Sequence, residues 1–172
     1  QRISFDNVPA FLYSKDLEIK VPGAGNISVD VGFGGNFFTI VDIDSIKMDL
    51  TKDKMDELRK LSKIILASAN EKIKVQHPAN KSINYMDQLL FVQNRQNEKG
   101  EYLCQCIFGD AQADISPCGT GTSTRLAQRY FRGLIDMSGT FYQKSIYGGG
   151  FRASAIKEID LNGTRAIIPR VS

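Results

Sequence analysis

The sequence predicts an α+β fold, and three observations lead to this class. Apolar and polar residues alternate over residues 27–31, as in a half-buried strand. Apolar residues recur at helical spacing over residues 53–68, and strand-like segments resume after them. The chain of 172 residues is 42% hydrophobic and 24% charged, so it can bury a sizeable core as one domain or as two closely packed halves.

The first part of the chain is expected to form strands joined by turns. Ile27, Val29 and Val31 are the apolar members of the alternating segment. The other expected elements are β-rich segments at 5–13 and 17–21, a turn at Pro22–Asn26, and a central strand at 37–41, where only Thr39 interrupts the apolar residues.

One amphipathic helix is predicted from about Asp53 to Ser68. Its apolar positions are Met55, Leu58, Leu61, Ile64, Ile65 and Ala69. Strands are then predicted at 85–93 and 101–108 around a polar hairpin loop at 93–100, and at 140–145, 151–160 and 165–169, with a turn at Asn162–Gly163. Strands, helix, strands, helix and strands in this order are typical of an α+β fold.

One cysteine, Cys118, stands immediately before the second predicted helix. Residues 123–132 have apolar side chains at 126, 127, 130 and 131, and Gly133 follows as a stop signal. Backbone N–H groups at a helix start favour a thiolate and can also hold an anion such as a carboxylate. The pattern therefore indicates a proton-transferring thiol beside a carboxylate site.

The residues after this cysteine, Gly119, Thr120, Gly121 and Thr122, allow two interpretations. Their N–H groups can bind a substrate carboxylate, with glycine permitting close approach. Alternatively they form an ordinary turn into the helix, with Ser123 or Thr122 as the N-cap. A P-loop is excluded, because its lysine and its longer spacing are missing.

The other cysteines suggest neither a disulfide framework nor a metal site. Cys104 and Cys106 share one face of an extended apolar segment and are expected to pack in the core. A Cys-x-Cys pair without further ligands is a poor zinc site, and the single histidine, His77, cannot complete one. No metal is therefore expected, and a reducing, cytoplasmic location is the default.

Charge and hydropathy argue against nucleic-acid and membrane partners. The net charge of +3, from 22 basic and 19 acidic residues, comes without a basic run. No apolar run approaches the roughly 20 residues that span a bilayer. No signal peptide is expected, because the chain begins directly in strand-like sequence.

The segment Asp114–Ser123, followed by a helix, resembles the second cysteine motif of the proline racemase family. That family includes proline racemases, 4-hydroxyproline 2-epimerases and trans-3-hydroxyproline dehydratases. Further segments resemble the second half of the family in the expected order, namely Asn7–Phe11, Val21–Gly25, Phe33–Phe38, Gln76–Pro78, Phe108–Asp114 and Ser145–Gly148.

The resemblance implies a lobe like that of diaminopimelate epimerase, with a strongly curved sheet wrapped around a central helix. It also implies cofactor-independent inversion of proline or 4-hydroxyproline at Cα, with Cys118 as one of two opposed acid/base thiols. Asp114 matches the acidic residue that contacts the substrate amine, although an Asx-turn would also explain it. Phe108 resembles a pocket aromatic that packs on the pyrrolidine ring, although core packing explains it equally well.

The sequence departs from the family pattern at two places. The first cysteine motif, of Cys-Gly-His-Gly-Thr type, is absent, so the chain resembles only the second lobe of a two-lobed enzyme. We therefore expect the chain alone to have little or no racemase activity, its partner to be the missing first lobe, and the full enzyme to be a possible homodimer. Ile115 stands where arginine is usual, which puts the loop geometry and substrate choice in question.

Three other functions remain open at this stage. The first is a lobe of a hydroxyproline dehydratase, but those members have Thr or Ser where this chain has Cys118. The second is a binding lobe that keeps the fold without the chemistry. The third is a cysteine hydrolase, for which His77 is the only imidazole that could act as the base.

Overall fold

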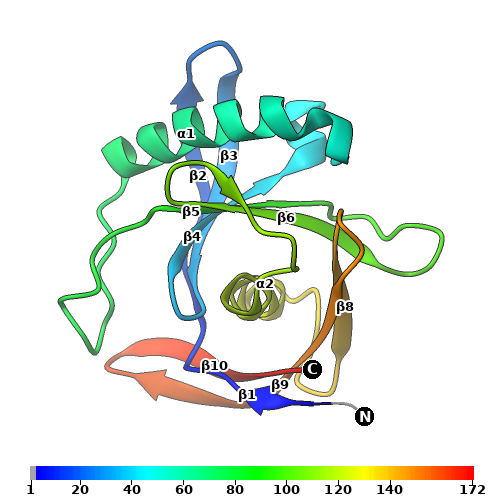
Figure 1. Ribbon diagram of the computed structural model, residues 1–172. Coiled ribbons are helices and arrows are strands. Elements are labelled where there is room, and N and C mark those ends of the chain that lie inside the picture. The colour runs from blue at the N-terminus through cyan, green and yellow to red at the C-terminus, as the bar shows by residue number, and fades with distance from the viewer. Residues whose placement is uncertain (1–2) are drawn as a thin grey trace.

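The computed structural model describes residues 3–172. Within them, ten strands form one mixed sheet in the order β1-β10-β9-β8-β6-β5-β4-β3-β2, with β7 paired to β6 (Figure 1). The strands are β1 (Phe5–Asp6), β2 (Phe11–Val21), β3 (Gly25–Phe33), β4 (Phe37–Asp42), β5 (Gln88–Val92), β6 (Tyr102–Phe108), β7 (Gln112–Ala113), β8 (Thr140–Ser145), β9 (Gly150–Leu161) and β10 (Thr164–Val171). The pairs β4–β5 and β6–β8 are parallel, and the other paired strands are antiparallel.

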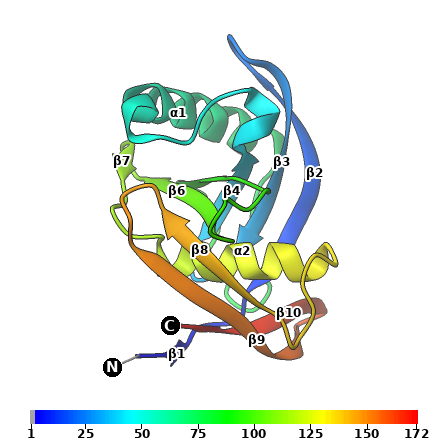
Figure 2. The same cartoon turned by 90° about the vertical axis from the view of Figure 1, so that its right-hand side faces the viewer.

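The sheet curves until its two ends meet around helix α2 (Gly119–Phe131). Ala10, just before β2, exchanges two backbone hydrogen bonds of 2.8 Å with Ile167 of β10. Figure 1 shows α2 almost end-on inside the sheet, and Figure 2 shows the same helix from the side. This confirms the predicted α+β class and the predicted curved sheet around a central helix.

Helix α1 (Met55–Lys72) lies on the outer face of the sheet (Figure 1). Met55, Leu58, Ile65 and Ala69 are buried against it, as their spacing predicts, whereas Ile64 is 37% exposed. The predicted start at Asp53 is slightly early, because Lys52–Lys54 form a short 3-10 turn before the α-helix. The predicted end at Ser68 is early by a turn, since the helix continues to Lys72.

The central strands bury both faces, which explains their largely apolar sequence. In β4, Phe37 and Val41 pack with the α1 side of the core, whereas Phe38 and Ile40 face a second cluster on the α2 side. Leu90, Val92, Cys104, Cys106 and Cys118 belong to that second cluster as well. Cys104 and Cys106 therefore share a buried strand face, as predicted, and this face looks toward the start of α2.

The second helix begins four residues earlier than its apolar pattern predicts. Its N-cap is Cys118, so neither Thr122 nor Ser123 caps it. The pattern misses the first turn because that turn is built from glycine and threonine, which are small enough to fit inside the curved sheet. Gly133 stops the helix as expected, with a φ of 70°.

The predicted strand boundaries are corrected in three places. The first strand-like segment divides into β1 and the long β2, which runs through residues 14–16 with register shifts near Ser14 and Leu17. β3 already begins at Gly25, inside the predicted turn, and β5 begins at Gln88 instead of residue 85. Within residues 3–172, no helix is both long enough and apolar enough to span a membrane.

Candidate functional site

Cys118 is the N-cap of α2, and its backbone is held in an unusual conformation. Its φ of 62° and ψ of 117° lie in a region that non-glycine residues rarely adopt. Its thiol sulfur accepts a hydrogen bond of 3.3 Å from the N–H of Gly121 and lies 3.4 Å from Oγ1 of Thr120. The backbone geometry therefore turns the sulfur toward the N–H groups at the helix start, and the residue is only 9% exposed.

These contacts lower the pKa of the Cys118 thiol to about 7. The largest cause is the neighbouring Cys106 thiol, and the contacts from Thr120 and Gly121 add to it. Burial and the negative charge of Asp114 act in the opposite direction. A thiol with this pKa is present both as thiol and as thiolate near neutral pH, so it can give or take a proton.

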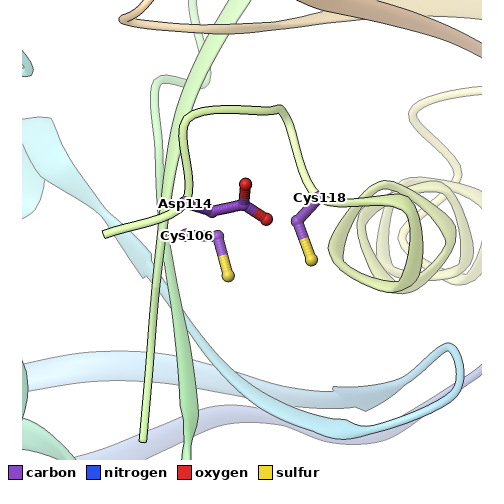
Figure 3. Close-up of side chains that lie close together, drawn as sticks. All are labelled: Cys106, Asp114 and Cys118. Carbon is purple, nitrogen blue, oxygen red and sulfur yellow. The ribbon is translucent and has the colours of Figure 1, made fainter. Parts of the chain in front are cut away.

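Asp114 lies on the loop between β7 and α2, and its carboxylate points toward Cys118 (Figure 3). Its Oδ1 accepts a 2.8 Å hydrogen bond from the N–H of Ser116, and the Ser116 hydroxyl oxygen accepts a 3.0 Å hydrogen bond from the N–H of Cys118. The Asx-turn interpretation therefore accounts for the hydrogen bond of one carboxylate oxygen of Asp114. The same carboxylate also lies within 4.8 Å of the Cys118 sulfur, so a turn role does not exclude a contact with a ligand.

The four residues after Cys118 differ in what their N–H groups contact. Gly121 donates to the Cys118 sulfur, and Thr122 donates to the Cys118 carbonyl at 2.8 Å. Gly119 and Thr120 occupy the first two positions of the helix, where N–H groups have no partner within the helix. Only these two are therefore well placed to receive a carboxylate.

Thr122 supports the loop from inside the core. It is fully buried, and its hydroxyl donates to the carbonyl of Pro117 at 3.3 Å. Gln143 of β8 donates to that same carbonyl at 3.2 Å and to the Thr122 hydroxyl at 3.0 Å. Thr122 thus fixes the segment that carries Cys118.

Phe108 ends β6 and is half-buried. Its ring packs against the buried cluster that contains Cys118. Phe108 pairs with Gln112 of β7, which turns the chain back toward Asp114. Both interpretations of Phe108, pocket wall and core residue, are compatible with this position.

Sequence reasoning missed the role of Cys106 next to Cys118. Cys106 is fully buried on β6, and its sulfur lies within 4.8 Å of the Cys118 sulfur and of the Asp114 carboxylate (Figure 3). Its pKa is raised by the neighbouring Cys118 thiol and by burial, so Cys106 remains protonated. The only sequence signal was its position on the same strand face as Cys104, which does not reveal what that face contacts.

Gln105 was also missed, although it holds the Asp114 loop. Its amide donates to the carbonyl of Asp114 at 2.9 Å and to the carbonyl of Cys106 at 2.8 Å, and the residue is fully buried. A buried glutamine within an apolar strand was the available signal, because such a side chain needs polar partners.

His77 is engaged outside this cluster. Its Nδ1 accepts hydrogen bonds from the N–H groups of Ala79 and Asn80, and its ring packs edge-on against Phe33. Burial lowers its pKa, so it is neutral near pH 7. These contacts give His77 a structural role in a turn and weaken the cysteine-hydrolase interpretation.

Two further residues, Gly34 and Ile115, lie around the start of α2. A Cβ atom on Gly34 would lie 2.5 Å from the backbone nitrogen of Thr124, so close packing against the helix explains this glycine. Ile115, between Asp114 and Ser116, is 73% exposed. An apolar side chain is thus presented to solvent beside the cluster of Cys106, Asp114 and Cys118.

Fold and site together define an α+β lobe whose central helix begins at a thiol of lowered pKa, the arrangement that the resemblance to a family of racemases and epimerases implies. The family model described as proline racemase matches residues 1–172. The chain belongs to the proline racemase family.

Curated relatives support this assignment along the whole chain. A proline racemase from Acetoanaerobium sticklandii is 36% identical over 173 residues, which is 100% of this chain and 52% of that protein. A proline racemase from Clostridioides difficile is 33% identical over 172 residues, covering 100% of this chain and 51% of that protein. A 4-hydroxyproline epimerase from Brucella suis is 34% identical and is covered to 52%.

Solved structures show the same fold. The crystal structure of a hydroxyproline epimerase from Agrobacterium vitis with bound trans-4-hydroxy-L-proline has a TM-score of 0.91 at 26% identity, over 98% of this chain and 48% of that one. A probable proline racemase from Agrobacterium radiobacter also has a TM-score of 0.91, at 28% identity. The chain spans about half the length of the relatives that it matches.

Proposed function

We propose that this chain forms one lobe of a two-lobed, cofactor-independent racemase or epimerase that inverts Cα of proline or 4-hydroxyproline. The observation that carries the proposal is the Cys118 thiol, whose pKa is lowered to about 7 at the start of a buried helix, next to Asp114. Proline racemases and 4-hydroxyproline epimerases among the relatives support the substrate class.

The chemistry assigned to Cys118 is proton transfer on one face of Cα. As thiolate, it takes the Cα proton while a thiol of the other lobe delivers a proton to the opposite face. In the reverse direction Cys118 is the donor. One S–H bond forms and the other breaks, so the pair of thiols exchanges roles and the net proton count is unchanged.

The substrate's charged groups have partners in this lobe. The N–H groups of Gly119 and Thr120 receive the carboxylate, with the helix start favouring negative charge. The Gly121 N–H holds the Cys118 thiolate instead, and Thr122 supports the loop. Asp114 pairs with the ammonium, and Phe108 packs on the ring.

The domain assignment follows from the same proposal. Residues 1–172 act as a single second lobe, and the first lobe of the complete enzyme supplies the partner thiol. The complete enzyme is cytoplasmic, and a homodimer is its proposed assembly. Both lobes are needed to enclose the substrate, so the chain alone is expected to be inactive.

The test is a racemisation assay in D2O, read by chiral separation and NMR. The purified 172-residue chain should leave L-proline and trans-4-hydroxy-L-proline unchanged. The two-lobed enzyme that contains this chain should place deuterium at Cα of the product stereoisomer while the remaining substrate stays protonated early in the reaction. Turnover by the isolated chain, or early deuterium in substrate and product alike, would reject the two-lobe, two-thiol proposal.

A further inference from the structure

Three side chains of metal-binding type converge at the start of α2, although they are separated along the chain. Cys106 comes from β6, Asp114 from the loop after β7, and Cys118 from the helix N-cap. Their sulfur and oxygen atoms all lie within 4.8 Å of one another, and Figure 3 shows the three side chains facing a common space.

The donor set and the spacing fit a soft divalent cation. Two thiolates and a carboxylate are ligands that Zn²⁺ prefers, and its bonds of about 2.3 Å to sulfur place two sulfurs about 3.8 Å apart in a tetrahedron. The present spacing therefore needs a contraction of at most about 1 Å to enclose such an ion. Small side-chain rotations of Cys106 and Asp114 can supply this movement.

The backbone of each donor residue is held in place by the fold. Cys106 is fixed by its pairing with Leu90 of β5. The carboxylate of Asp114 is oriented by the N–H of Ser116, and the backbone of Cys118 is tied to the Ser116 hydroxyl. Positioned ligands of this kind favour ion binding, because little ordering remains to be done when the ion arrives.

We propose that Cys106, Asp114 and Cys118 form a binding site for one thiophilic divalent cation of the Zn²⁺ class, with the fourth position open to water. Binding displaces the Cys106 proton, and the Cys118 proton from the fraction that is still a thiol, to solvent; two S–metal bonds and one O–metal bond form. Cys104 takes no part, because its sulfur faces the carbonyl of Pro117 at 3.8 Å. No metal site was expected from the sequence, where Cys104 and Cys106 were considered as the pair of cysteine ligands.

The consequence for catalysis rests on the proposed function, whereas the binding itself does not. An ion at this site occupies the sulfur that transfers the proton and the carboxylate assigned to the substrate ammonium. Cation and amino acid therefore exclude each other. A lobe of this kind is switched off by thiophilic ions without any change in its fold.

The test is a titration of the 172-residue chain with Cd²⁺, followed by the ultraviolet absorbance of metal–thiolate bonds, with Zn²⁺ as competitor. We expect one ion per chain. Cys106→Val keeps the apolar packing and should weaken binding by roughly tenfold or more, because it removes a ligand. Cys104→Val, on the same strand face, is the matched control and should bind like the wild type.

Circular dichroism checks that the variants fold, and Cys106→Ser replaces Cys106→Val if the valine does not fit. Absence of metal–thiolate absorbance in the wild type, or equal affinity of the wild type and a folded Cys106 variant, overturns the proposal. The outcome is independent of racemisation. Ion binding by a lobe whose complete enzyme does not racemise would reject the proposed function alone, and racemisation without ion binding would reject the metal site alone.

Discussion

At the scale of single residues, the properties of Cys118 come from an uncommon backbone conformation. A φ of 62° at a residue with a Cβ is costly, yet it brings the sulfur to the N–H of Gly121 and near the hydroxyl of Thr120. The packing of the surrounding loop holds the residue there. Backbone strain at this position is thus coupled to a lowered thiol pKa.

The pH dependence of alkylation should report that pKa. We expect the rate of iodoacetamide reaction at Cys118 to rise with a midpoint near pH 7, since the thiolate is the reactive form. Buried Cys104 and Cys106 should react much more slowly, because their pKa values are raised. Mass spectrometry of tryptic peptides measures the three sites separately.

Thr120→Val should shift this profile to higher pH, because it removes one hydrogen bond to the thiolate. Thr140 is exposed at the start of β8, so Thr140→Val is a control that should leave the midpoint of the alkylation profile unchanged. Equal alkylation of all three cysteines, or no shift in Thr120→Val, would contradict the assignment of Cys118 as the activated thiol.

Two glycines on the first turn of α2 offer a matched comparison. A Cβ on Gly121 would lie 3.2 Å from the Cβ of Cys118 and 3.3 Å from its sulfur, whereas a Cβ on Gly119 would meet nothing closer than Phe5 at 3.7 Å. Gly121→Ala should therefore displace the thiol and slow its alkylation. Gly119→Ala should react like the wild type, and similar rates in both variants would argue against the tight fit at Gly121.

How far the sequence predicts the site depends on where the partners lie along the chain. Cys118 and Asp114 were found because their local motif carries the signal, and the helix N-cap follows from it. Cys106 lies on another strand, and only the tertiary fold brings its sulfur within 4.8 Å of the Cys118 sulfur. Gln105 and Gln143 were missed for the same reason, since their partners are loop carbonyls brought close by tertiary folding.

At the scale of elements, the position of α2 depends on close contact with the turn between β3 and β4. Gly34 lies in that turn, and a Cβ there would be 2.5 Å from the backbone nitrogen of Thr124 and 2.6 Å from the carbonyl oxygen of Thr120. Backbone atoms cannot move aside as a flexible side chain can. The first turn of α2 therefore packs directly against the backbone of Gly34.

Gly34→Ala should consequently lower the free energy of unfolding by about 1–3 kcal/mol or more, since overpacking forces the backbone apart. Gly149→Ala is the control, because its nearest neighbour would be Pro117 Cδ at 3.7 Å. Urea denaturation measures both. A Gly34→Ala variant as stable as Gly149→Ala would contradict the close approach.

Periodicity predicted the elements well where a single face is buried and less well at their ends. Helix α1 has one apolar face, so its spacing was readable. Helix α2 is buried from Gly121 to Arg129, and its polar buried residues hide the pattern. Arg125 is an example. Its side chain is 1% exposed, and it is stabilised there by hydrogen bonds to Gln128 and Asn94. The spacing of apolar residues does not predict that this charged side chain is buried.

At the scale of the whole molecule, α2 is joined to the sheet by an ionic network as well as by apolar packing. Arg132 donates to both carboxylate oxygens of Asp30 on β3, at 2.7 and 2.6 Å, and Gln128 also donates to Asp30. Burial raises the pKa of Asp30, but these hydrogen bonds outweigh it and hold the pKa below its ordinary value.

Arg132→Met should lower the free energy of unfolding by about 3 kcal/mol at neutral pH, because it leaves Asp30 buried without its cation. Since the folded-state pKa of Asp30 is lowered, its stabilising contribution is complete above the unfolded pKa of about 3.9 and is lost as the pH falls below it. The difference between wild type and variant should therefore shrink in acid.

Arg170→Met tests an exposed ion pair of the same type. Arg170 and Asp6 are 51% and 48% exposed, so solvent screens their attraction and the loss should be much smaller. Thermal or urea unfolding across pH measures both variants. Equal losses, or a loss in Arg132→Met that does not depend on pH, would contradict the stabilising role of the buried network.

Family resemblance allowed the architecture of the whole molecule to be predicted more completely than composition did. The closure of the sheet rests on pairings between residues more than 150 positions apart, namely Ala10 with Ile167 and β1 with β10. Local sequence does not encode those pairings individually.

The most direct test of the central claim, that Cys118 is one of two proton-transferring thiols, is the rate of Cα inversion in the two-lobed enzyme carrying Cys118→Ala. We expect kcat for proline or 4-hydroxyproline to fall by about 10²–10⁴-fold, since one acid/base group is lost. Cys104→Val should keep the wild-type rate. Undiminished inversion by a folded Cys118→Ala enzyme would contradict the claim.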